Sequence, residues 1–548
     1  MWLQLSATKT RAQLLEGDAH GDGTLTRSLG AWDLLAIGVG STVGTGVFSI
    51  TGEVARTEAG PAVLLCWCIG GFGCFLSALS YMELSAHLPA AGAVYAFAYH
   101  LLGEVFAVLG AAMITLEYGI SASAVAANWG DKFRTLLASM GANNLANRCG
   151  IRFGPVTVSF PSLIVLLIVT AMIYVGGDLG KRFARGSSVL AVILILTMTT
   201  VAIIDFEASN FEPFIPPDMG IAGVLAGSVT TFFGFIGFDE VCCMAGEATN
   251  PRKTVPRALI GTLLCATVLP LAASLALVGF TPYTSIDPSS GFAVAFRDRG
   301  WTALAYAVQL GQLVVLFVVT YMCFLAQPRV FFALARDGLL PCRFAELNEA
   351  GEPWFATLMT GVLVVACGAL LPFSTLANAI SGGVCVNFNL VNCCMVVLRG
   401  GGQSCRLGGS LFGFNGFCLL TALLLRQVLG EDVEGMAHVW ALAAASVAAL
   451  ATILCFVAIT AYLRDQAASD NEVFFRVPCV PLLPCCAMTF NNVMISSMKA
   501  LDFLLLACYT ALVVGPYLFF TWSRRRRRLL DIRCELMSSP GNASEVLN

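Results

Sequence analysis

The sequence has few charged residues, few histidines and little net charge. Asp, Glu, Lys and Arg make up 12% of its 548 residues, which is about half their share in an ordinary soluble domain. The chain is 57% hydrophobic, with a mean hydropathy of +0.80, and this excludes an ordinary soluble protein. With only four histidines, no His cluster and no nucleophile beside a base can be recognised. We therefore predict no enzymatic step, no catalytic residue, no metal site and no cofactor, and the net charge of −3 gives no reason to expect a nucleic-acid partner.

Apolar runs of about 20 residues occupy most of the chain. A helix that rises 1.5 Å per residue needs about that many residues to cross a hydrocarbon core about 30 Å thick. The first thirty residues contain no apolar core ahead of a small-residue cleavage site, so we expect no cleaved signal peptide. We predict an all-α polytopic membrane protein with fourteen spans, at residues 31–51, 60–81, 104–128, 158–176, 187–205, 222–246, 258–280, 301–326, 355–372, 377–398, 411–429, 437–462, 479–499 and 502–522.

The basic residues are unevenly distributed between the two sides of these spans. If the side that carries Arg524–Arg528 is the cytoplasm, 22 of the 31 Lys and Arg residues lie on the cytoplasmic side and 9 outside. Cytoplasmic loops carry this excess in membrane proteins, so we predict that both termini are cytoplasmic and that the loop 131–157 is outside. We interpret the five arginines as a stop-transfer anchor, with contact to anionic lipid headgroups as the functional alternative. All cysteines except Cys149 fall in spans or on the inner side, so a disulfide framework is not expected.

Glycines interrupt the first and the sixth span. The first contains GVGSTVGTGVF (38–48) and the sixth SVTTFFGFIGFDEV (228–241). The spacing G-x-G-x-x-x-G inside an apolar run excludes a dinucleotide-binding fingerprint, which needs G-x-G-x-x-G after a strand. Gly40 and Gly44 also fit the G-x-x-x-G pattern of helix packing. However, two glycine-interrupted spans at corresponding places in two five-span halves indicate an inverted-repeat transporter with its site at the midplane.

The directions of the two spans predict what such a site binds. Span 1 runs from inside to outside, so we expect free amides and the positive end of a helix dipole at Gly44 to Gly46, suited to a carboxylate. Carbonyls near Phe233 to Ile236 and near Thr42 would accept hydrogen bonds from an ammonium group. Together these groups predict an α-amino acid as the substrate, bound in a cavity that Gly46 lines.

These motifs resemble those of a known family. GVGSTVGTGVF, FFGFIGFDEVCCMAGEATNPRKTVPRAL, PRVFFALARDGLLP, LEYGISASAVAANW and FFRVPCVPLLP are similar to segments of the cationic amino acid transporter family of the amino acid–polyamine–organocation superfamily, over roughly residues 30 to 525. The resemblance implies alternating access by a ten-helix core of the LeuT type, built from two inverted five-helix repeats. It implies substrate contacts from Thr42, Thr45 and Gly46 in span 1 and from Phe233, Gly234 and Ile236 in span 6.

The resemblance also suggests how the chain is divided. We expect a transport core at residues 31–400 between cytoplasmic tails at 1–30 and 524–548, with helices 11 and 12 at 401–475 and helices 13 and 14 at 476–523. The role of the last four helices is not given by any motif, and neither is the oligomeric state.

Three carboxyl groups lie inside predicted spans. All three are candidates for side-chain recognition or proton binding. Glu117 lies mid-span, where an ionised carboxylate facing lipid costs about 3 kcal/mol or more, so we expect it to face the bundle interior, with hydrogen bonding to neighbouring helices alone as the alternative role. Asp239 and Glu240 follow the interruption of span 6; Asp239 matches the family pattern and Glu240 departs from it. Glu240 is interpreted either as a source of cation preference or as a residue facing an aqueous vestibule. We interpret Asn387, Asn389 and Asn392 as one polar cluster that links helices.

One further departure bears on coupling. Proton-coupled bacterial relatives are similar in GKRFARGSSVLAVILIL but carry a lysine where this chain has Leu194. Leucine does not titrate, so we expect uniport driven by the membrane potential, at about 2.3 kcal/mol per 100 mV for a cation.

The sequence therefore predicts a transporter of arginine, lysine or ornithine embedded in a lipid bilayer. The alternatives are a proton-coupled or broad-range neutral amino acid transporter of the same fold and, with less support, a non-transporting amino acid sensor. We expect the plasma membrane as its location, with a vacuolar or lysosomal membrane as the alternative.

Overall fold

The apolar runs form helices, because a helix pairs its own backbone amides and carbonyls where no water is present. The computed structural model describes residues 29–89, 92–153, 156–175, 178–348, 351–370, 373–402, 404–429, 436–465 and 475–538. Eleven helical segments in these ranges are long and apolar enough to cross a membrane. Predicted spans 4, 9 and 13 form shorter apolar helices, α10 (Phe160–Val175), α17 (Trp354–Leu370) and α21 (Leu482–Ser496). Each of the fourteen predicted spans thus coincides with a helix.

The first half of the core contains spans 1 to 5. Span 1 is α3 (Ala31–Thr45), η1 (Gly46–Ile50) and α4 (Thr51–Thr57), and span 2 is η2 (Gly60–Ala62) and α5 (Val63–His87). A short helix, α6 (Val94–Leu101), precedes span 3, which consists of α7 (Glu104–Ile114), η3 (Thr115–Ile120) and α8 (Ser121–Ser139). The helix α10 is span 4, and α11 (Asp178–Ile204) is span 5.

The second half of the core contains spans 6 to 10. After η4 (Ala208–Phe211), span 6 is built from α12 (Gly220–Phe232), η5 (Phe233–Phe235), α13 (Glu240–Cys243) and η6 (Met244–Glu247). The remaining elements are α14 (Pro251–Phe280), η7 (Tyr283–Ser285), α15 (Gly291–Asp298), α16 (Thr302–Arg336), η8 (Cys342–Ala345), α17 and α18 (Phe373–Arg399).

A small hairpin departs from the predicted all-helical fold. Within the loop 131–157 and its end, α9 (Asn143–Arg148) is followed by two antiparallel strands, β1 (Gly150–Phe153) and β2 (Val156–Ser159), with Gly150 opposite Ser159. The hairpin ends at Ser159, directly before α10 begins, so it lies at the start of span 4 and does not interrupt the helical core.

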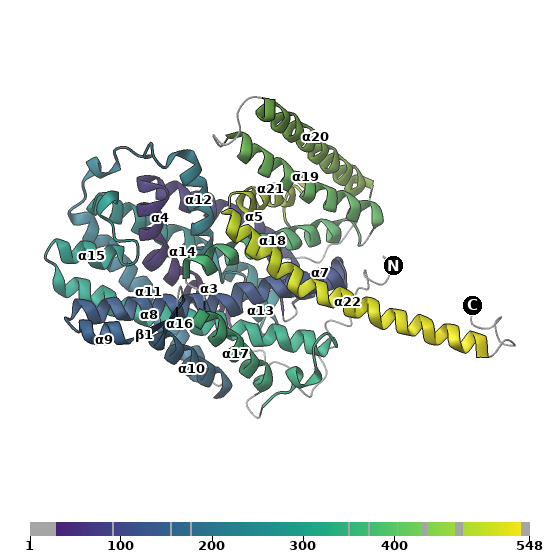
Figure 1. Ribbon diagram of the computed structural model, residues 1–548, viewed down its shortest axis with the longest axis horizontal. Coiled ribbons are helices and arrows are strands. Elements are labelled where there is room, and N and C mark those ends of the chain that lie inside the picture. Colours follow the sequence, from purple (N-terminus) through teal and green to yellow (C-terminus); the bar gives the residue numbers. More distant parts are fainter. Residues whose placement is uncertain are drawn as a thin grey trace.

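The interrupted spans lie at the centre of the helix bundle. The helix α3 packs against α11, α14 and α16, and its continuation η1 contacts η5 of span 6. The helices α19 (Cys405–Leu429), α20 (Met436–Asp465) and α21 lie at one side of this core, and α22 (Ala500–Ser538, yellow) runs across it and extends beyond it in this view (Figure 1). Contacts with α5 and α18 connect α21 to the core, whereas α20 packs mainly on α19.

Candidate functional site

Span 1 changes its hydrogen-bond pattern at Gly46 without unwinding. The chain passes from α3 into the π-helical turn η1, the amide of Gly46 donates to the carbonyl of Val43, and the hydroxyl of Thr51 donates to the carbonyl of Gly46 at 3.2 Å. The predicted open break with free amides at Gly44 to Gly46 is therefore wrong for this conformation. The physical reason is that a π-helical turn keeps backbone groups paired where unpaired ones cost several kcal/mol each.

Span 6 is interrupted as predicted. The helix α12 ends at Phe232, the short turn η5 follows, and Ile236 has a ψ of 134° while Gly237 has a φ of +104°. A side chain is strained at that φ, which explains the glycine. The hydroxyl of Ser41 on α3 donates to the carbonyl of Gly237 at 3.1 Å, so span 1 pairs part of the backbone that the interruption exposes.

The π-helical turn of span 1 and the interruption of span 6 meet at a pair of glycines. A Cβ placed on Gly46 would lie 3.4 Å from the Cα of Gly234 and 2.8 Å from Cη2 of Trp67 on α5. The predicted cavity at Gly46 is thus filled by the Trp67 ring in this conformation, which corrects the expectation. The indole Nε1 of Trp67 is buried and has no hydrogen-bond partner among the described residues. Sequence reasoning missed Trp67, because an aromatic residue in an apolar run is typical of a core.

The other predicted backbone-site residues are all close to this contact but differ in what they face. Thr42 is buried, and its hydroxyl donates back to the carbonyl of Gly38 at 2.8 Å. A Cβ at Gly44 would lie 2.6 Å from Val315 and 2.7 Å from Val319 on α16, so Gly44 serves helix packing. Phe233 and Ile236 are buried, with 1% and 4% exposure, and the side chain of Thr45 lies outside the described residues.

A buried group of carboxyl side chains lies beside the interruption of span 6. Glu117 lies in η3, a π-helical turn of span 3, and the amide of Asn387 on α18 donates to its Oε2 at 3.0 Å. The hydroxyl of Tyr118 donates to Oδ2 of Asp239 at 2.7 Å. Glu117 and Asp239 lie within hydrogen-bonding reach of each other, and both are fully buried. The structure thus confirms that Glu117 faces the bundle interior and brings it to Asp239.

This group, which we call the acid cluster, consists of Glu117, Tyr118, Asp239 and Asn387. Three of its buried oxygens, Glu117 Oε1, Asp239 Oδ1 and Asn387 Oδ1, have no hydrogen-bond donor among the described residues, and neither has Oε1 of the neighbouring Glu240. A buried polar atom without a partner costs free energy, and an unpaired buried carboxylate costs more. Guanidinium and ammonium groups carry only donors, which are the groups that these acceptor oxygens lack. Within the described part of the chain, no group of three or more His, Cys, Asp or Glu side chains is arranged to hold a metal ion.

Two of the three asparagines of span 10 link helices as predicted, and Asn387 lies apart from them, which corrects the interpretation as one cluster. Asn387 faces Glu117, whereas Asn392 accepts a hydrogen bond from Ser80 on α5 at 2.7 Å. Asn389 donates to Asn492 at 3.0 Å and accepts from Asn491 at 3.1 Å, both on α21. Asn389 and Asn392 therefore link α18 to neighbouring helices, and Asn387 belongs to the acid cluster.

Polar contacts close one face of the core, the predicted cytoplasmic face. Arg329 near the end of α16 pairs with Glu247 at 3.0 Å and with Glu352 at 3.5 Å. The amide of Leu29 donates to the carbonyl of Glu247 at 3.0 Å, and the amide of Thr249 donates to the carbonyl of Leu29 at 3.0 Å. These contacts join the start of span 1 to the ends of spans 6 and 8. We call the residues that make them, Leu29, Glu247, Thr249, Arg329 and Glu352, the Arg329 gate.

A tyrosine adds to the closure of this face. The hydroxyl of Tyr95 on α6 donates to Oδ2 of Asp337 at 2.6 Å, which links α6 to the segment after α16. Burial, followed by the charge of Asp337, raises the pKa of Tyr95 above its ordinary value. The phenol therefore stays protonated and keeps donating to Asp337.

Leu194 lies in apolar surroundings. A Cβ at Gly311 on α16 would lie 2.3 Å from Cδ2 of Leu194, and Val315, one turn further along α16, faces Gly44. Leu194, where the sequence resemblance implies a lysine in proton-coupled relatives, is thus packed against span 8.

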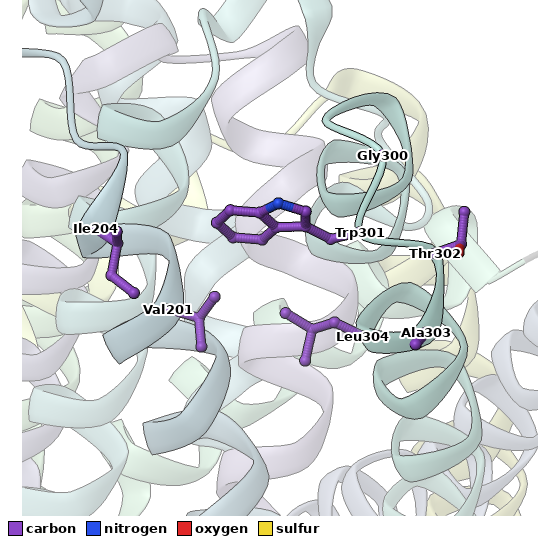
Figure 2. Close-up of a pocket in the computed structure, with 7 residues that line it drawn as sticks. All are labelled: Val201, Ile204, Gly300, Trp301, Thr302, Ala303 and Leu304. Carbon is purple, nitrogen blue, oxygen red and sulfur yellow. The ribbon is translucent and has the colours of Figure 1, made fainter.

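A surface pocket lies away from the acid cluster. Figure 2 shows Trp301 pointing from the start of α16 toward Val201 and Ile204 at the end of α11. Its lining is apolar apart from Thr302 and contains none of the residues predicted for the site. We therefore place the candidate site at the meeting of the interrupted spans.

The comparisons with known proteins agree with this architecture. The model of the amino acid permease family matches residues 29–460, and the chain belongs to that family, within the amino acid–polyamine–organocation superfamily. It is 34% identical to the methylthioribose transporter of Bacillus subtilis, over 69% of this chain and 82% of that protein. It is 28% identical to cationic amino acid transporter 1 of Arabidopsis thaliana, over 93% and 84% of the two chains. The family predicted from the motifs is confirmed.

A solved structure supports the fold. MhsT in complex with L-phenylalanine matches 80% of this chain and 100% of its own, with a TM-score of 0.51 and 15% sequence identity. At this identity the likeness shows the fold alone. The predicted polytopic core of the LeuT type is therefore confirmed, and the protein is a multi-pass integral membrane protein.

Proposed function

We propose that this permease transports cationic α-amino acids, with arginine, lysine and ornithine as substrates, by alternating access. Backbone groups at Thr42 to Gly46 and Phe233 to Ile236 hold the α-carboxylate and α-ammonium once Trp67 moves away from the two glycines and the π-helical turn at Gly46 opens. The acid cluster then holds the cationic end of the substrate side chain. Glu117 and Asp239 are the residues to which we assign that role.

The observation that carries this proposal is the set of unpaired acceptors in the acid cluster. A neutral side chain supplies no donors and no charge to these oxygens, so their desolvation would stay uncompensated. A guanidinium group has five N–H donors in one plane and forms charge-assisted hydrogen bonds with carboxylates. Relatives named as cationic amino acid transporters add support.

A second candidate function is transport of neutral substrates. The branched-chain amino acid permease of Bacillus subtilis is 32% identical over 71% of this chain. Uptake of labelled arginine, leucine and alanine by the purified full chain in liposomes distinguishes the two candidates. We expect arginine uptake that unlabelled lysine and ornithine inhibit; leucine uptake that arginine leaves unchanged would contradict the proposal.

For coupling, we infer uniport driven by the membrane potential. The support is the apolar packing around Leu194, which leaves no titratable group at that position. A potassium diffusion potential of 100 mV, negative inside, corresponds to about 2.3 kcal/mol per charge and hence to about fifty-fold accumulation of a cation. A proton gradient applied at zero potential should produce no accumulation. Uphill uptake under that gradient would show that another group carries the proton.

We further propose that both termini are cytoplasmic and that the Arg329 gate is the inner gate. The charge distribution of the sequence supports this orientation. The plasma membrane is the proposed location, with residues 31–400 as the transport core. Epitope tags at the two ends should label only after permeabilisation of the cells, and labelling of intact cells at either end would contradict the orientation.

A further inference from the structure

Glu240 is a buried acid that the interruption of span 6 places between two other spans. It is the first residue of α13 and is 1% exposed. Its carboxyl group lies within hydrogen-bonding reach of Ser41 on α3 and of Cys323 on α16. The interpretation of Glu240 as a residue in an aqueous vestibule is therefore wrong for this conformation, because helices from three spans enclose it.

The position of Glu240 along the membrane normal follows from its neighbours. Gly44 on α3 faces Val319 on α16. Ser41 and Cys323 each lie about one helical turn from these two residues, on the side of the Arg329 gate, because α3 starts and α16 ends at that side. Glu240 is thus located between the Gly46–Gly234 contact and the Arg329–Glu247 pair.

The surroundings of Glu240 do not satisfy an ionised carboxylate. Oε1 has no hydrogen-bond partner, and the described residues form no ion pair with Glu240. The hydroxyl of Ser41 is already within bonding distance of the carbonyls of Ile37, Gly38 and Gly237, and a thiol is a weak donor. Asp239, the adjacent residue, adds a like charge. A group with these surroundings calls for a cation with several N–H donors.

We propose that Glu240 is a specificity-determining residue that binds the cationic end of the substrate side chain on its way from the Gly46–Gly234 contact to the Arg329 gate. The inference rests on the proposed function and extends it to a residue on the gate side of the Gly46–Gly234 contact. The ligand class is an α-amino acid with a guanidinium or ammonium side chain. Such a cation would meet Glu117 and Asp239 first, then Glu240, and Glu247 once the Arg329 gate opens.

The test compares two substrates in two variants of the full-length protein in liposomes. Glu240→Gln keeps the shape and removes the charge, and Glu240→Asp keeps the charge. We expect kcat/KM for arginine to fall at least about tenfold in Glu240→Gln, while kcat/KM for leucine changes less than about twofold. Glu240→Asp should retain most of the arginine activity. Thermal unfolding of each purified variant, with and without arginine, shows whether it folds and whether arginine still stabilises it.

The remaining outcomes each overturn the inference in a recognisable way. An equal loss for arginine and leucine in Glu240→Gln would show a packing role. An unchanged arginine rate with a lost pH dependence would make Glu240 a proton carrier instead. If the unmodified protein transports arginine and Glu240→Gln behaves like it, this inference fails and the proposed function stands. If the unmodified protein carries leucine and not arginine, the proposed function fails, and this inference fails with it.

Discussion

Arg329 and Glu247 form an ion pair at 3.0 Å in which both side chains are nearly fully buried, with 5% and 7% exposure. The pair joins the end of span 8 to the end of span 6, and the carbonyl of Glu247 also accepts a hydrogen bond from the amide of Leu29. Removing one partner of a buried pair costs about 3–5 kcal/mol, because the other charge is left uncompensated. The Arg329 gate should therefore contribute substantially to holding this face of the core together.

Arg329→Ala should open that gate. The substitution leaves Glu247 and Glu352 without their cation, so we expect lower thermal stability and faster hydrogen exchange at the amides of residues 247–249. Mass spectrometry of hydrogen exchange measures this directly. Arg343→Ala, at an exposed position just after α16, is the matched control and should exchange like the unmodified protein. Equal exchange in both variants would rule out a gating role for Arg329.

Gly46→Val should abolish arginine binding, because the added side chain meets Trp67 and the backbone of Gly234 where the two interruptions touch. Gly44→Val should instead reduce the yield of folded protein, since its side chain meets Val315 and Val319 and overpacking is destabilising. Gly416→Val on α19 is the control, because no described residue lies within 4 Å of the added Cβ. Surface expression and arginine-induced thermal shifts measure the two effects. Normal arginine binding in folded Gly46→Val would exclude the proposed backbone site.

Glu117→Gln should weaken arginine binding by about ten- to a hundredfold, because a charge-assisted hydrogen bond contributes about 1.5–3 kcal/mol. Binding of a neutral amino acid, where it is measurable, should change little. Competition against labelled arginine gives the affinities. Glu104→Gln changes an acid at the start of the same span, which pairs with Tyr517 at 2.5 Å away from the acid cluster, and should leave arginine binding intact. A similar loss in both variants would point to a general defect of span 3.

Asn389→Ala should lower the free energy of unfolding by about 1–2 kcal/mol, because it removes two interhelical hydrogen bonds between α18 and α21. Reversible unfolding in mixed micelles is the measurement, and Asn144→Ala at an exposed position on α9 is the control. Arginine affinity should stay unchanged in the Asn389 variant. A stability equal to that of the control would show that α21 is held by apolar packing alone.

The spans and the interruption of span 6 could be predicted from the sequence, since both follow from local chemistry. Hydropathy indicates which residues form a helix that crosses the membrane. A glycine such as Gly237 is the residue that a left-handed φ favours. The π-helical turns at Gly46 and Glu117 had no such signal, because their residues also fit an α-helix. Whether an interrupted span unwinds or only changes its hydrogen bonds depends on the helices packed around it.

The composition of the acid cluster could be predicted only in part. Glu117 and Asp239 stood out as charges in apolar runs, and their pairing was not visible because it depends on how spans 3 and 6 cross. The separate roles of the asparagines in span 10 did have a signal. At 100° per residue, Asn389 lies about 200° from Asn387 around the helix and only about 60° from Asn392, so a helical projection would have separated them.

The π-helical turn at Thr115–Ile120 determines the direction in which the later side chains of span 3 point. A π-helical turn contains one residue more than the α-helical turn it replaces, so the direction of every later side chain in the span depends on that extra residue. Deleting one residue here would restore a regular helix and rotate the part beyond it by about 100° relative to the part before it. Glu117 and Tyr118 would then lose their common orientation toward Asp239. In this span a single-residue deletion should be more damaging than most substitutions, and homologous sequences that lack one residue here should also lack the carboxyl pair.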